Sequence, residues 1–340
     1  MAITDLEATA GALVPPGKGI LAADESHATV GRRFEAVGIP NTEENRRLYR
    51  QMLFAAQGIA EFLSGVILYD ETIRQKADDG TPFVDLLARQ GILPGIKVDR
   101  GTKPLARVGE QVTEGLDGLR ERLAEYRALG ARFAKWRAVF AIGPGIPSRY
   151  ALGVNAHALA RYAALCQEAG VVPIVEPEVL MEGDHPLERC FEVTEAVLHG
   201  TFHALHEQGV VLEGMLLKPN MVLAGERCPR QPSVQEVAEA TLRCLRRTVP
   251  AAVPGIVFLS GGQRDELATA HLNAMNALPG PHPWQLSFSY ARALQTPALR
   301  AWRGDPARVA EGQKAFSHRA RLNSAARFGR YTPELERAVA

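Results

Sequence analysis

The sequence predicts an α/β protein of the (β/α)₈ TIM-barrel class, built as one domain over residues 1–340. The first observation is a series of eight short apolar runs, too short for helices and too continuous for strands with one wet face. The second is that segments with helical periodicity and capping signals lie between these runs. Repeated strand–helix units without a Gly-rich dinucleotide turn favour a closed parallel barrel over an open, doubly wound sheet.

Nearly every predicted strand ends in a charged or hydroxyl residue. Because barrel enzymes assemble their active sites at the C-terminal ends of the strands, these terminal side chains are the candidates for chemistry. The predicted strands are, in chain order, Gly19 to Asp24, Gly65 to Asp70, Gly95 to Asp99, Arg132 to Arg137, Val172 to Glu176, Met215 to Lys218, Ile256 to Ser260 and Gln285 to Ser289.

The helices are predicted from periodicity and from capping residues. An extra helix over Asp5 to Val14 is expected before the first strand, and helical character returns over Asp305 to Arg330. The polar tail at 331–340 contains Pro333 and is expected to be flexible. Helix starts are predicted at Asn41 with Glu44, at Asn155 leading into His157 to Ala169, and at Ser233 leading into Val237 to Leu245.

Composition excludes several classes of protein. Lys plus Arg number 39 and Asp plus Glu 38, without a basic arm, so neither nucleic acid nor a membrane surface is an expected partner. The chain shows neither a signal-like N-terminus nor an apolar stretch of roughly 20 residues, and we expect a cytoplasmic protein. Four widely spaced cysteines predict reduced, mostly buried thiols.

Lys218 is the candidate nucleophile. It ends an apolar strand and precedes Pro219, so its amine is expected to enter the C-terminal end of the barrel. A lysine there can simply be salt-bridged or reach solvent. However, Lys135 is expected to face the same opening, and repulsion with desolvation would lower the pKa of one lysine. A neutral amine attacks ketones, which predicts Schiff-base chemistry.

Carboxylates suited to proton transfer end two other strands. Glu176 and Glu178 flank Pro177, and two such groups can hold different pKa values and serve imine formation. Their alternative role is charge balance for the nearby lysines and Arg137. Asp24 ends the first strand, where it can orient a substrate hydroxyl.

Two segments are suited to bind phosphate. Ser260, Gly261 and Gly262 follow the seventh strand, where glycines let backbone N–H groups approach an anion and barrels often bind phosphate. Arg292 follows the eighth strand and can add a charged fork. A second anion site is expected at another part of the rim, at Lys97, Ser26 and Thr29.

Three histidines on one predicted helix resemble a metal site. His199, His203 and His206 follow Glu195 at helical spacing on the segment Leu187 to His206. That helix belongs to the outer ring, so we expect a solvated face, and no catalytic metal.

Seven ordered segments together resemble the class I fructose-1,6-bisphosphate aldolases along nearly the whole chain. They are Gly17-Lys-Gly-Ile-Leu-Ala-Ala-Asp-Glu-Ser, Pro94-Gly-Ile-Lys-Val-Asp, Phe133-Ala-Lys-Trp-Arg, Pro173-Ile-Val-Glu-Pro-Glu, Leu216-Leu-Lys-Pro-Asn-Met-Val, Phe258-Leu-Ser-Gly-Gly-Gln and Ser287-Phe-Ser-Tyr.

The resemblance implies reversible cleavage of fructose 1,6-bisphosphate to dihydroxyacetone phosphate and glyceraldehyde 3-phosphate, without a cofactor and in a homotetramer. Lys218 would form the Schiff base, Glu176 would transfer protons, Lys135 would assist dehydration, and Asp24 would orient Lys218 and the C4 hydroxyl. Glu178 matches an acidic partner, and Arg137 a further substrate contact. The C1 phosphate would bind Ser260, Gly261, Gly262 and Arg292, and the C6 phosphate Lys97, Ser26, Thr29 and Arg33.

This sequence departs from the family pattern at a few positions. Animal members end in a tyrosine that promotes proton exchange, whereas Tyr331 is the only tyrosine in this tail, and either it substitutes or the step proceeds without it. Ala291 and Thr29 stand where many relatives have glycine and serine, which predicts altered affinity. Alternative functions are a Schiff-base aldolase preferring sedoheptulose 1,7-bisphosphate or fructose 1-phosphate, and a non-catalytic scaffold.

Overall fold

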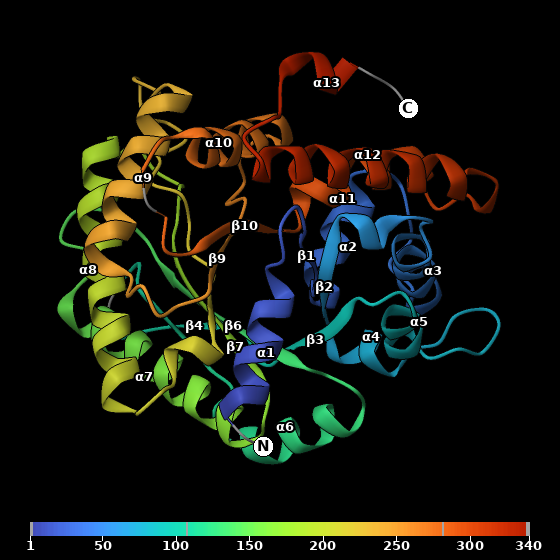
Figure 1. The fold of residues 1–340 in the computed structure, drawn as a ribbon, viewed down its shortest axis with the longest axis horizontal. Helices are drawn as coiled ribbons and strands as arrows, with labels where there is room; N and C mark the ends of the chain where they lie inside the picture. Colours follow the sequence, from blue (N-terminus) through green and yellow to red (C-terminus); the bar gives the residue numbers. More distant parts are fainter. Residues whose placement is uncertain (1–2, 107, 281, 338–340) are drawn as a thin grey trace.

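The computed structural model describes residues 3–106, 108–280 and 282–337, and they form a (β/α)₈ barrel (Figure 1). Within these residues eight parallel strands close in the order β1-β2-β3-β6-β7-β8-β9-β10, and β10 pairs with β1. The predicted fold class is therefore confirmed. The strands are β1 (Gly19–Ala23), β2 (Leu63–Leu68), β3 (Leu93–Lys97), β6 (Phe133–Phe140), β7 (Val172–Val179), β8 (Leu216–Leu217), β9 (Gly255–Phe258) and β10 (Gln285–Tyr290).

Two neighbouring strands are longer than predicted. The pairing of β6 with β7 runs from Phe133 opposite Val172 to Phe140 opposite Val179. Glu176 and Glu178 therefore lie inside β7, and the prediction that the strand ends at Glu176 is wrong. The reason is that Glu178 of β7 forms an ion pair with Arg137 of β6. These charged residues were expected to end the two strands, but their pairing lets both strands continue past them. β8 is short, and Lys218 follows it directly, donating its backbone N–H to Val175 O at 2.8 Å.

Helices surround the barrel, and α7, α8 and α9 pack side by side in chain order along one side (Figure 1). A small antiparallel hairpin of β4 (Thr102–Pro104) and β5 (Gln111–Thr113) is inserted after β3. The α-helices are α1 (Ile3–Leu13), α2 (His27–Glu35), α3 (Glu43–Phe54), α4 (Asp70–Arg74), α5 (Phe83–Arg89), α6 (Leu119–Ala128), α7 (Arg149–Glu168), α8 (Leu187–Glu207), α9 (Val234–Thr248), α10 (Asp265–Ala277), α11 (Arg292–Trp302), α12 (Val309–Arg327) and α13 (Pro333–Arg337).

The capping predictions succeeded once and failed twice. Ser233 caps α9 in a capping box with Glu236, as predicted. The start expected at Asn41 lies one residue later, because the Thr42 side chain accepts from Asn45 N–H. The start expected at Asn155 is wrong by more than a turn, since Ser148 caps α7. Asn155 is instead buried within that helix and accepts from Thr113 N–H of the hairpin.

The predicted N-terminal helix is present and fills one end of the barrel. Leu6, Ala10 and Leu13 of α1 pack with inward-facing strand residues such as Phe133 in a compact apolar cluster. Gly95 of β3 makes room for this ring, since a Cβ there would lie 2.3 Å from Phe133. With this end filled, the open space of the barrel lies at the opposite, C-terminal end of the strands.

The sequence also predicted buried, reduced cysteines and a flexible C-terminal tail. Cys166, Cys190 and Cys244 are buried free thiols, as expected, and Cys228 is partly exposed. In the tail, 331–337 include the short helix α13, and Tyr331 is buried. Residues 338–340 lie outside the described part, and the flexibility of the tail stays a prediction. None of the described helices combines the length and the apolar character needed to span a membrane.

Candidate active site

A cavity of about 1100 Å³ opens at the C-terminal ends of the barrel strands. It is lined by nearly all the site residues predicted from the sequence, which come from seven of the eight barrel strands or from the segments that directly follow them. Those lining it are Asp24, Ser26, Thr29, Arg33, Lys97, Lys135, Arg137, Glu176, Glu178, Lys218, Ser260, Gly261 and Arg292. Gly262 does not line it but lies against Arg292, which does.

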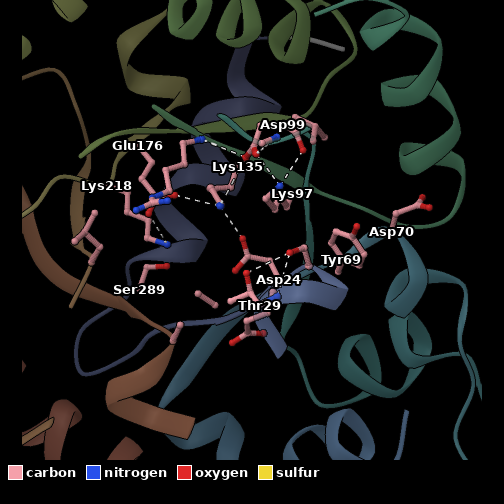
Figure 2. A pocket seen from close by; sticks show the side chains of 18 of the residues that line it. Asp24, Thr29, Tyr69, Asp70, Lys97, Asp99, Lys135, Glu176, Lys218 and Ser289 are labelled. Carbon is pink, nitrogen blue, oxygen red and sulfur yellow. Dashed lines mark hydrogen bonds and ion pairs between the residues drawn. The ribbon is translucent and has the colours of Figure 1, made fainter. Parts of the chain in front are cut away.

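At the bottom of this cavity four charged side chains form one buried group, which we call the lysine–carboxylate cluster: Lys218, Glu176, Lys135 and Asp24 (Figure 2). Glu176 bridges the two lysines. Its Oε1 lies 3.2 Å from Lys218 Nζ, and its Oε2 lies 3.2 Å from Lys135 Nζ. A carboxylate placed between two amines can pass a proton between them or to a ligand bound beside them.

Asp24 is the second anion of the cluster. Its Oδ2 lies 2.6 Å from Lys135 Nζ. Burial alone would raise the pKa of Asp24, but the positive charges of Lys135 and Lys218 outweigh it and hold this pKa well below its usual range. Asp24 is therefore an ionised carboxylate, which can accept a hydrogen bond from a substrate hydroxyl.

Lys135 behaves differently from the simple repulsion argument. Burial alone would lower its pKa, but Asp24, Glu176 and Asp99 raise it well above the usual lysine range. Repulsion between lysines therefore does not deprotonate Lys135. The opposing carboxylates keep Lys135 as an ammonium ion, which can donate a proton. Lys218, in contrast, has a single carboxylate within 4 Å among the described residues, that of Glu176.

Glu178 and Arg137 form a separate pair next to the cluster. Arg137 Nε donates to Glu178 Oε2, and the pKa of Arg137 is raised, since Glu178 outweighs the effect of its burial. The charge-balance role considered for Glu178 is therefore present, and it is exerted on Arg137 rather than on the lysines.

The remaining predicted residues form the rim of the cavity: Ser260, Gly261, Gly262, Arg292, Lys97, Ser26, Thr29 and Arg33. In the segment of residues 260–262 the chain turns sharply, with φ of +62° at Gly261 and +91° at Gly262. A Cβ at Gly262 would lie 3.0 Å from Arg292 Nη2, so the glycine lets the guanidinium approach this loop. The pKa of Arg292 is lowered by partial desolvation and by Arg33, as expected for two neighbouring cations.

At the opposite part of the rim, the predicted anion-binding residues already bind other groups of the protein. Lys97 Nζ lies 2.6 Å from Asp99 Oδ1 and donates to Asp99 O at 2.9 Å. Ser26 caps α2, and its hydroxyl lies 3.2 Å from the Thr29 hydroxyl. A phosphate here would share Lys97 with Asp99.

Sequence reasoning missed Asp99, Glu25 and Ser289. Asp99 pairs with Lys97 and lies 3.9 Å from Lys135. Ser289 Oγ is buried in the cavity wall without a hydrogen-bond partner among the described atoms, and is free to bind a ligand. Asp99 and Ser289 both end predicted strands, so the signal was in the sequence and was not used. Glu25 follows such an end by one residue.

The histidines and Tyr331 lie away from this cavity. His199, His203 and His206 are exposed on the outer helix α8, as predicted. Tyr331 donates its hydroxyl hydrogen to Glu336 Oε1 at 2.8 Å, and its N–H donates to Asn273 Oδ1. It is not among the described residues that line the cavity, so in this conformation Tyr331 does not reach the cluster.

The fold and this site define a class of protein, a (β/α)₈-barrel enzyme with paired buried lysines and carboxylates beneath a cationic rim. A family model described as fructose-bisphosphate aldolase class-I matches residues 5–340. The chain belongs to the class I fructose-bisphosphate aldolase family, and the predictions of this family and of a carbon–carbon lyase are confirmed.

Individual relatives agree with the family match. The chain is 59% identical to a probable class 1 fructose-bisphosphate aldolase of Xanthomonas campestris, covering 97% of this chain and 99% of that protein. It is 55% identical to the non-muscle aldolase of Lethenteron camtschaticum, over 94% and 89%. A solved structure of Plasmodium falciparum aldolase, in complex with TRAP and a small-molecule inhibitor, superposes with a TM-score of 0.95 at 51% identity, over 97% and 95%.

Proposed function

We propose that this protein cleaves fructose 1,6-bisphosphate reversibly through a Schiff base on Lys218. The observation that supports this most is the position of Glu176, whose two oxygens contact Lys218 and Lys135 at 3.2 Å each in a buried pocket. Family membership supports a phosphorylated sugar as the substrate.

In the proposed reaction the Lys218 amine attacks the C2 ketone, and the carbinolamine loses its hydroxyl as water. Lys135, held as an ammonium, and Glu176 lie where they can supply and remove the protons of this step. The protonated imine then accepts the electron pair of the C3–C4 bond as an enamine. The C4 hydroxyl, oriented by Asp24, passes its proton to Glu176 as glyceraldehyde 3-phosphate leaves.

Protonation of the enamine at C3 and hydrolysis of the imine then release dihydroxyacetone phosphate. The same groups serve in reverse, with Glu176 returning the proton. The charge changes occur among side chains that are already paired and shielded from solvent, so little reorganisation accompanies them.

The rim supplies orientation in this proposal. The C1 phosphate would bind the 260–262 loop and Arg292, and the C6 phosphate would bind Lys97, Ser26, Thr29 and Arg33. Two anchored phosphates would hold the scissile bond over the cluster and convert binding into reactive alignment. Arg137 and Glu178, at the cavity wall, would contact the sugar between them.

Sedoheptulose 1,7-bisphosphate and fructose 1-phosphate remain alternative preferred substrates, because they differ from fructose 1,6-bisphosphate only at the rim. The cluster argues against a non-catalytic scaffold, since a binding module has no use for two buried lysines. We further propose a cytoplasmic homotetramer, as in the family; light scattering of the purified protein tests the oligomeric state.

Borohydride trapping tests the mechanism. The protein is reduced with borohydride in the presence of dihydroxyacetone phosphate and mapped by peptide mass spectrometry, while a parallel assay follows cleavage in a metal chelator. We expect an adduct on Lys218 and undiminished cleavage. No adduct, or activity lost to the chelator, would refute the Schiff-base mechanism.

A further inference from the structure

Glu25 is a buried carboxylate that the mechanism above does not use. It follows Asp24 directly, but the two side chains serve different partners: Asp24 pairs with Lys135 in the cluster, and Glu25 pairs with residues of the surrounding helices. Only 4% of the Glu25 side chain is exposed. A carboxylate this deeply buried must be paired, so its partners show what it holds in place.

Two guanidinium groups and one amide meet at Glu25. Arg33 Nη1 of α2 donates to Oε1, and Arg50 Nη2 of α3 donates to Oε2 at 2.5 Å. Gln295 Nε2 of α11 donates to the same Oε1 at 2.8 Å. Burial alone would raise the pKa of Glu25, but Arg50 and Arg33 lower it, so the carboxylate stays charged.

Gln295 extends this contact to the helix that begins at Arg292. Its Nε2 also donates to Ala22 O of β1 at 2.6 Å. Its Oε1 accepts from Tyr49 OH at 3.1 Å and from Arg50 Nη1 at 3.2 Å. The first turn of α11 is thus tied to the end of β1 by a fully bonded, buried amide.

The two rim arginines differ in a way that this arrangement explains. Arg33 has a fixed carboxylate partner, and Glu25 raises its pKa despite burial. Arg292 makes no ion pair with any described residue, and burial together with the charge of Arg33 lowers its pKa. Glu25 places a negative charge beside one of two neighbouring cations, which reduces the repulsion between them.

We infer that Glu25 is a positioning residue for phosphate binding: it holds Arg33 at the rim of the cavity, and the Gln295 amide fixes the carboxylate for this role. This inference rests on the proposed function, in which both arginines bind phosphate. Glu25 acts through Arg33 and touches no reacting atom, so it governs substrate affinity and not the chemical step.

A double-mutant cycle tests the inference. Glu25→Gln keeps the shape and removes the charge, and we expect KM for fructose 1,6-bisphosphate to rise about tenfold, as for loss of one charge-assisted contact, with kcat changed by less than about twofold. Arg33→Ala is expected to give a similar rise. If Glu25 acts through Arg33, the double variant shows no further rise beyond that of Arg33→Ala.

Glu35→Gln is the matched control, since it removes the same charge from an exposed position of α2 and is expected to leave KM unchanged. The inference would be overturned if Glu25→Gln left KM unchanged or lowered kcat as much as it raised KM. It would also be overturned if the KM effects of Glu25→Gln and Arg33→Ala multiplied in the double variant. Arg50 would lose its main partner in Glu25→Gln. If that variant does not fold, as judged by circular dichroism, Glu25→Asp keeps the charge but withdraws it from Arg33, and the same KM rise is expected.

A second readout separates this inference from the proposed function. The same four proteins are titrated with inorganic phosphate by calorimetry, which needs no turnover. Weaker binding in Glu25→Gln and Arg33→Ala, without additivity, supports the positioning role even if the wild-type protein fails to cleave fructose 1,6-bisphosphate. Equal phosphate affinity in all four proteins would overturn it while leaving the cleavage reaction intact.

Discussion

The lysine–carboxylate cluster and the rim both gather charge in one cavity, but they do so in opposite ways. In the cluster the side chains of Lys218, Lys135 and Glu176 are each 4% exposed, and every charge has a partner. At the rim Arg292 is exposed and has no ion-pair partner among the described residues. Buried charges must be paired before a ligand arrives, whereas a cation open to solvent can wait for its anion.

This difference separates chemistry from binding. The cluster has preorganised charges that a substrate meets in place, which favours the transition state and therefore affects kcat. At the rim Arg292 has no ion-pair partner among the described residues, and in the proposed function it gains one only when phosphate binds, which would affect KM. Substitutions in the two regions should therefore give different kinetic signatures, and the following predictions test that division.

The largest effect is expected in the cluster at Lys218. Lys218→Met removes the amine, and kcat should fall by about 10⁴-fold or more, as for loss of a covalent nucleophile. Steady-state cleavage and borohydride labelling are measured together. The exposed lysine Lys314 provides the control, since Lys314→Met should keep both activity and label. A Lys218→Met protein that still cleaves at a tenth of the wild-type rate would exclude this lysine as the nucleophile.

Asp24 should make the cluster sensitive to acid. Asp24→Asn removes a buried partner of Lys135, and unfolding should become easier by about 3 kcal/mol at pH 7. The folded pKa of Asp24 lies below its unfolded value of roughly 4, so its contribution is complete above about pH 5 and is lost as the pH falls further.

Urea unfolding of both proteins from pH 7 to pH 3 measures this contribution. The difference between wild type and Asp24→Asn should be constant down to about pH 5 and should shrink below pH 4. A difference that grows on acidification would mean that Asp24 is not held ionised by the lysines.

At the rim, Arg292→Ala should raise KM by roughly tenfold to thirtyfold and lower kcat much less, because it removes a charged fork from the phosphate. Arg300→Ala, an exposed arginine of the same helix, is the control and should leave both constants unchanged. A loss confined to kcat would show that the rim takes part in chemistry, and would remove the division between the two regions.

The smallest effect is expected at Tyr331. Because its hydroxyl is bound to Glu336 and its ring is buried, Tyr331→Phe should leave turnover within about twofold of wild type. Exchange of the C3 proton of dihydroxyacetone phosphate, followed by NMR, should be equally unaffected. If Tyr331→Phe lost this exchange while keeping its fold, Tyr331 would have to leave Glu336 during the reaction and act in place of the C-terminal tyrosine of the animal relatives.

The sequence by itself determined the barrel and the identity of the candidate side chains. Eight apolar runs ending in polar residues indicate parallel strands with their functional groups at one end, because strands buried on both faces are typical of parallel sheets. Asp24 and Lys218 follow from that rule without any knowledge of distances, whereas Lys135 and Glu176 lie inside β6 and β7.

Only the tertiary structure decided which charges meet. Lys135 is held by Asp24 and Asp99, Lys97 pairs with Asp99, and Glu178 pairs with Arg137. Glu25 joins α2 and α3, which follow it in the sequence, to the distant α11. The physical reason is that periodicity reports which face a residue occupies, while an ion pair depends on strand register and on separations of a few ångströms between remote segments. For that reason the repulsion argument, drawn from two lysines alone, could not say which lysine stays charged: Asp24, Glu176 and Asp99 raise the pKa of Lys135 despite its burial.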